Sequence, residues 1–68
     1  MNMTSVSSSN IDSIGYEDNT LYVRFNSGAL YAYYNVPQST YAGLMSASSH
    51  GKYLAAYVKG NYRYQRIG

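Results

Sequence analysis

The side chains best suited to chemistry in this chain are its tyrosines, several of which alternate with arginine or stand near lysine. The 68-residue sequence holds ten tyrosines and five lysines or arginines. Proteins bind single-stranded RNA by stacking bases on aromatic rings and by setting arginine or lysine against phosphates. The pattern therefore predicts contacts with single-stranded RNA or tRNA on one sheet face and in the C-terminal segment, through Tyr22, Arg24, Tyr34, Lys59, Arg63, Tyr64 and Arg66.

Charge is unevenly distributed along the sequence, which has a formal net charge of +2. The acidic side chains are confined to residues 12–18, and all but one of the basic side chains lie within 52–66. This asymmetry indicates an anionic partner for the C-terminal part, with ordinary solubilising charge as the alternative. Exposed tyrosine and arginine also anchor protein interfaces, so a protein partner or homo-oligomerisation is the second functional hypothesis.

The residues that usually carry catalysis are nearly absent. His50 is the only histidine and there is no cysteine, so no histidine pair or thiolate set is available to hold a metal. Ser49 precedes His50, but sequence neighbours rarely have the geometry of a nucleophile and its base, and no carboxylate lies nearby in the chain. We expect His50 to act in a turn or cap. We expect no enzyme activity, no cofactor, no metal and no small-molecule substrate.

The N-terminus and the apolar pattern bear on the cellular location. Residues 1–9 lack the basic and apolar regions of a signal peptide, and no apolar run approaches the roughly 20 residues of a membrane span. These features predict a cytoplasmic protein with no membrane partner. Residues 1–8 are polar and serine-rich, which predicts a loose tail, and residues 9–68 are expected to form a single domain.

The elements that must position the tyrosines begin with three strands. A short apolar pattern predicts a strand at about 10–17, and Leu21, Val23 and Phe25 alternate with polar residues as in a half-buried strand. The segment 26–28 ends in glycine and predicts a hairpin into a third strand at 29–36. A three-residue loop turns Tyr31 and Tyr33 inward, whereas a two-residue loop would swap the faces of the third strand. We favour the three-residue loop because it places Gly28 where a positive φ is needed.

Two helices are expected after Pro37, which cannot donate to a sheet ladder and suits a helix start. A thin apolar stripe predicts a helix at about 38–47, with Ser39 as an alternative cap. A stronger stripe predicts a second helix, capped by Ser49 and ended by Gly60, and residues 61–68 are either extended coil or a short edge strand. The predicted fold class is α+β, a three-stranded antiparallel meander with two short helices packed on one face. In the second helix, the side chains expected to face the core are those of the apolar stripe, Tyr53, Leu54, Tyr57 and Val58.

A set of motifs follows in a fixed order along the chain: Ser8–Ile11, Ile14–Tyr16, Leu21–Gly28, Tyr31–Tyr33, Asn35–Pro37, Tyr41, Leu44, Ala47, Ser49–Tyr53, Tyr62–Tyr64 and Arg66–Ile67. This ordered set resembles the KTSC domain, a short module found as a free-standing bacterial protein and at the C-terminus of some lysyl-tRNA synthetases. Ala55 stands where the family often has asparagine, and Arg63 stands where it often has proline between two tyrosines. The resemblance implies RNA binding, because the domain occurs in some tRNA synthetases.

Overall fold

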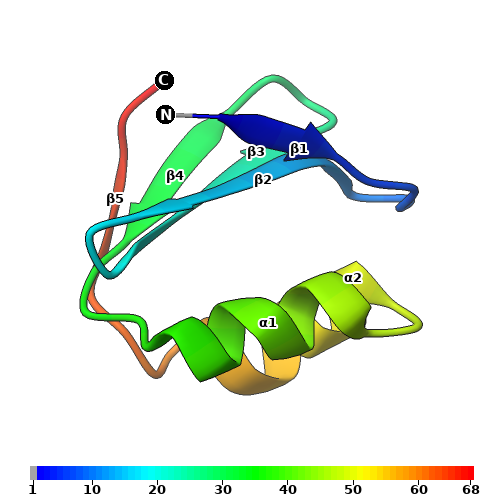
Figure 1. Ribbon diagram of the computed structural model, residues 1–68. Helices are drawn as coiled ribbons and strands as arrows, with labels where there is room; N and C mark the ends of the chain where they lie inside the picture. Colours follow the sequence, from blue (N-terminus) through cyan, green and yellow to red (C-terminus); the bar gives the residue numbers. More distant parts are fainter. Residues whose placement is uncertain (1) are drawn as a thin grey trace.

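An antiparallel five-stranded sheet, with its helices across one face, makes up the computed structural model, which describes residues 2–68 (Figure 1). The strands lie side by side in chain order. The predicted α+β class is confirmed, but the prediction of three strands is wrong because each end of the chain adds one more. The elements are β1 Met3–Ser5, β2 Ile11–Glu17, β3 Thr20–Phe25, β4 Leu30–Tyr33, α1 Gln38–Ser46, α2 His50–Tyr53, a π-helical turn η1 Leu54–Val58, and β5 Tyr64–Arg66.

The two strands missing from the prediction lie at the edges of the sheet. β1 pairs with β2, with Thr4 opposite Ile14, so the prediction of a loose tail over 1–8 is wrong for residues 3–5. β5 pairs with β4, with Tyr64 opposite Tyr33, which makes the edge-strand alternative for the C-terminal segment the right one. β1 is short and none of its side chains is buried, so it is held by backbone pairing with β2. A strand of this kind carries no apolar alternation from which it could be predicted.

The central hairpin forms with the predicted three-residue loop. Gly28 has a φ of +97°, and the backbone N–H of Phe25 donates to the carbonyl of Ala29 over 2.9 Å. Val23 therefore lies opposite Tyr31, and the two-residue loop is excluded. Tyr33 is 3% exposed and Tyr31 is half-buried on the same face, which confirms that both point inward.

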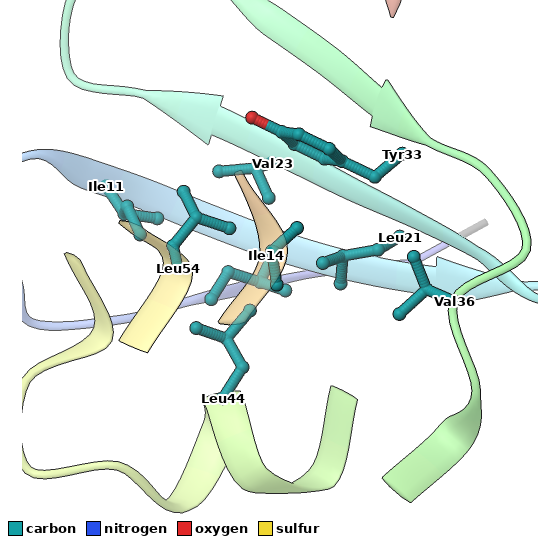
Figure 2. Close-up of a cluster of buried hydrophobic side chains, with 9 residues drawn as sticks. Ile11, Ile14, Leu21, Val23, Tyr33, Val36, Leu44 and Leu54 are labelled. Atoms are coloured by element: carbon teal, nitrogen blue, oxygen red, sulfur yellow. The ribbon is translucent and has the colours of Figure 1, made fainter. Parts of the chain in front are cut away.

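The core lies between the sheet and the helices (Figure 2). Full burial of a valine, leucine or isoleucine side chain contributes about 1.5–3 kcal/mol, so this cluster is the main stabilising feature of so short a chain. Tyr16 closes one end of the core, because its hydroxyl donates to the Val36 carbonyl and its ring stacks on Tyr41 with centroids 4.8 Å apart. The buried cluster consists of Ile11, Ile14, Leu21, Val23, Tyr33, Val36, Leu44, Leu54 and Val58.

Caps and turns bound the helices. Pro37 is the N-cap of α1, so the alternative cap Ser39 is not used. Ser49 caps α2 as predicted, since its hydroxyl accepts from the Lys52 backbone N–H over 3.3 Å. His50 joins the two helices through a 2.8 Å hydrogen bond between its Nδ1 and the Leu44 carbonyl oxygen. This contact agrees with the turn or cap role expected for His50.

The second helix departs from the prediction in two ways. It passes from α2 into the π-helical turn, in which the Lys59 N–H bonds the Leu54 carbonyl over 2.9 Å. The buried side of this segment is centred on Leu54 and Val58. Tyr57 stands beside that line and is 59% exposed, so its assignment to the core is wrong. In residues 2–68 no helix has the length and apolar character needed to cross a membrane.

Candidate nucleic-acid interface

The structure divides the predicted contact residues between the two faces of the sheet. Tyr22 lies opposite Ala32 on the face that the helices leave uncovered, called here the outer face. Tyr64 and Arg66 lie opposite Tyr33 and Tyr31, so they share the inner face with the core. The seven predicted residues therefore do not form one contact surface.

The outer-face residues are largely engaged within the protein. Arg24 donates from Nη1 to the Gly28 carbonyl over 2.8 Å, and the Tyr34 hydroxyl donates to Oε1 of Gln65 over 3.2 Å. Ala32, at the centre of this face, is only 1% exposed although no helix covers it. Neighbouring side chains therefore shield the centre of this face, and Tyr22 and Tyr34 are each half-buried there.

Arg63 directly precedes β5. Its carbonyl oxygen accepts from the Tyr34 backbone N–H over 2.8 Å, which continues the pairing of β4 with β5. The residue is exposed, and it does not line the pocket described next.

An open depression of about 780 Å³ occupies the part of the inner face that the helices do not cover. We call it the inner pocket. It combines side chains of β3, β4 and β5 with the residues that follow the π-helical turn. No carboxylate lines it among the described residues 2–68. The lining residues are Asn10, Phe25, Ser27, Ala29, Tyr31, Tyr33, Lys59, Gly60, Tyr64 and Arg66.

Aromatic rings form one wall of the inner pocket. Tyr31 meets Phe25 edge-on with ring centroids 5.5 Å apart and stacks along β4 with Tyr33 at 6.4 Å. Tyr64 crosses from β5 and lies 5.9 Å from Tyr31 and 5.7 Å from Tyr33. These contacts fix the inner side of the Tyr64 ring, while the residue is 61% exposed. Tyr64 therefore offers an aromatic surface that is both supported from behind and open to solvent.

Two cations stand at the inner pocket. Lys59 follows the π-helical turn in an extended conformation, and its Nζ lies 5.4 Å above the centre of the Phe25 ring. Gly60, with a φ of +83°, turns the chain directly afterwards, as expected of a helix stop. Arg66 donates from Nε to the Gly68 carbonyl over 3.0 Å. No acidic side chain of residues 2–68 lines the pocket, so Lys59 and the guanidinium nitrogens that Arg66 does not use in this bond remain for an anionic ligand.

Phenol hydroxyls add hydrogen-bonding capacity. Burial raises the pKa of Tyr33 above 10.0, and the neighbouring Tyr31 and Tyr64 raise it further, so its hydroxyl is a neutral donor at physiological pH. Within residues 2–68 no protein group bonds this hydroxyl, yet it is not sealed from solvent. Figure 2 shows the Tyr33 oxygen directed away from Val36. The tip of this otherwise buried side chain therefore reaches the inner pocket.

The sequence predicts some of the residues that line the inner pocket but not all of them. The sequence predicts contacts for Lys59, Tyr64 and Arg66, whereas its alternation assigns Phe25, Tyr31 and Tyr33 to the core. The core assignment of Tyr33 is correct. Its hydroxyl also reaches the inner pocket, which is formed in part by β5 beside β4. The alternation of residues 61–68 allows an edge strand there, but it does not give the register of β5 against β4.

A second depression, of about 350 Å³, is lined by serines and His50. The Nδ1 atom of His50 is taken by the Leu44 carbonyl, and Ser49 is taken by the helix cap. Across residues 2–68 there is no group of three or more histidine, cysteine, aspartate or glutamate residues able to hold a metal ion. The inner pocket is thus the better candidate site.

These features define a small α+β domain whose single sheet is covered on one face and keeps an aromatic, basic pocket beside the helices. The chain belongs to the KTSC domain family, whose model matches residues 7–62. A crystal structure of a KTSC domain protein from Yersinia pestis superposes with a TM-score of 0.94, at 38% identity, over 98% of this chain and 97% of that one.

Two kinds of protein are similar to this chain in sequence. An uncharacterized protein of Stutzerimonas stutzeri is 40% identical over 98% of this chain and 99% of its own length. A lysine–tRNA ligase of Nostoc sp. is 35% identical over 71% of this chain, which corresponds to only 9% of the ligase. The same fold therefore occurs both in proteins of similar length and as a small part of a larger enzyme.

Proposed function

We propose that this protein is a non-enzymatic, cytoplasmic module that binds single-stranded RNA at the inner pocket. The observation that carries the proposal is the exposed ring of Tyr64, supported from behind by Tyr31 and Tyr33 and flanked by Lys59 and Arg66. Any of the four RNA bases can stack on such a ring, and each stacked base contributes about 1–3 kcal/mol of binding free energy.

The charges of the inner pocket favour a nucleotide over other aromatic ligands. Lys59 and Arg66 repel cations, and no acidic side chain of residues 2–68 lines the pocket to offset them. A ligand that joins a flat ring to a negative charge satisfies both parts of the site, and each unit of an RNA strand is such a group. The lysine–tRNA ligases among the relatives support RNA as the ligand class, since their name places the domain in enzymes that act on tRNA.

The test compares the two most exposed tyrosines of the chain. A labelled single-stranded RNA of about six nucleotides is titrated by fluorescence anisotropy with the wild type, Tyr64→Leu and Tyr57→Leu. Tyr57 is a matched control, being 59% exposed against 61% for Tyr64 and lying outside the inner pocket. We expect Tyr64→Leu to weaken binding about tenfold, Tyr64→Phe to retain it and Tyr57→Leu to leave it unchanged. Equal binding by the two leucine variants, or no binding by the wild type at low salt, would refute the proposal.

A protein partner or self-association is the second candidate, favoured by the open edges of β1 and β5. Neither strand has a neighbour on its outer side in the described sheet, and such edges can pair with another chain. Sedimentation equilibrium over a range of protein concentrations tests self-association. A mass that stays that of the monomer at every concentration argues against it.

A further inference from the structure

β5 presents unpaired main-chain groups beside the inner pocket. The Arg63 carbonyl accepts from Tyr34, and the Ile67 N–H donates to the Leu30 carbonyl over 2.8 Å, so the odd-numbered residues of this segment bond β4. In an antiparallel pair the bonded positions alternate with positions whose N–H and C=O point the other way. Tyr64 and Arg66, which lie opposite Tyr33 and Tyr31, hold those alternate positions.

The outer side of β5 is open. β5 is the last strand in the sheet order, and all of its residues are exposed. In Figure 1 no other element runs along its outer side. The N–H and C=O groups of Tyr64 and Arg66 therefore face solvent, next to the ring and the guanidinium group that the same two residues bring to the inner pocket.

We infer that the free main-chain edge of β5 reads an unpaired RNA base that stacks on Tyr64, an inference that rests on the function proposed above. One extended residue offers a donor and an acceptor on the same side, and every RNA base carries a neighbouring acceptor and donor on its Watson–Crick edge. Lys59 and Arg66 hold the adjacent phosphates. The site therefore accepts any base and rejects paired ones, because pairing occupies the edge that β5 would bond.

Amide hydrogen exchange of the intact chain tests this inference directly. In the free protein we expect the amides of Tyr64 and Arg66 to exchange quickly and that of Gln65, which points toward β4, to be protected. A single-stranded RNA of about six nucleotides at about ten times its Kd should slow exchange at one or both of Tyr64 and Arg66 by up to about tenfold. Gln65 and the opposite edge strand β1 serve as controls and should not change.

An abasic oligonucleotide of the same length keeps the phosphates and removes the bases. We expect it to bind at least about tenfold more weakly and to leave the Tyr64 and Arg66 amides unprotected at equal occupancy. RNA that shifts the pocket resonances while both amides stay unprotected overturns the edge inference and leaves the proposed function standing. RNA that binds nowhere on the chain overturns the proposed function as well. Protection by an acidic extended peptide but not by RNA overturns the inference by assigning this edge to strand addition from a protein.

Discussion

The salt dependence of RNA binding distinguishes the inner pocket from a contact surface spread over both faces. Each phosphate neutralised on a single strand contributes about −0.7 to the slope of log affinity against log salt concentration. The inner pocket holds two cations, Lys59 and Arg66, so the expected slope is about −1.4. Raising the salt from about 50 to about 200 mM should then weaken binding about sevenfold.

A footprint that also included Arg24 and Arg63 would double the number of phosphates. The slope would then be about −2.8, and the same change of salt would weaken binding about fiftyfold. Fluorescence anisotropy titrations at several salt concentrations separate the two cases, because sevenfold and fiftyfold losses are easily distinguished.

Single substitutions sharpen the comparison. Lys59→Gln should reduce the slope to about −0.7, so that the same change of salt weakens binding only about threefold. Arg63→Gln serves as the matched control, since Arg63 is exposed, basic and outside the inner pocket. A slope that falls with Arg63→Gln and not with Lys59→Gln would refute the assignment of phosphate contacts to the inner pocket.

Two further predictions concern the fold that holds the inner pocket in place. A Cβ at Gly43 would lie 2.8 Å from Cζ of Tyr53 and nearer still to its hydroxyl oxygen. Gly43→Ala should therefore lower the free energy of unfolding by about 1–3 kcal/mol in urea titrations, yet raise it by up to about 1 kcal/mol in a Tyr53→Leu background; the same sign in both backgrounds would contradict the close packing. Because the pKa of Tyr33 is raised above its ordinary value of 10.0, its stabilising contribution is complete below pH 10.0 and is lost as the pH rises through the folded pKa. Urea unfolding above pH 10.0 should show a smaller loss of stability in Tyr33→Phe than in the wild type, and equal losses would disagree with burial of this phenol.

The sequence predicts the centre of the sheet better than its edges. Alternation of Leu21, Val23 and Phe25 marks β3, and Gly28 fixes the hairpin and so the face of each tyrosine in β4. Met3–Ser5 has no such signal, because β1 is held by backbone pairing with residues eight to twelve positions further along the chain. Edge strands of this kind depend on the rest of the sheet and leave little trace in side-chain pattern.

The candidate site shows the same division. Tyr64 and Arg66 are recognisable as an aromatic and a basic residue, but their face depends on the register of β5 against β4. The apolar stripe also predicts that the second helix extends through Leu54–Val58, but it does not predict that this part is a π-helical turn. Lys59 directly follows that turn and lies over the Phe25 ring, while Leu54 and Val58 of the turn are buried in the core. The sequence thus supplies the residue types, and long-range packing decides which of them meet.

The central claim, that RNA binds at the inner pocket, is tested most directly by mapping chemical-shift changes on ¹⁵N-labelled protein during titration with a short single-stranded RNA. We expect the largest changes at Lys59, Gly60, Tyr64 and Arg66, with small changes at Tyr22 and Arg24 on the outer face. The largest changes at Tyr22 and Arg24 with an unperturbed inner pocket, or no changes at low salt, would contradict the claim.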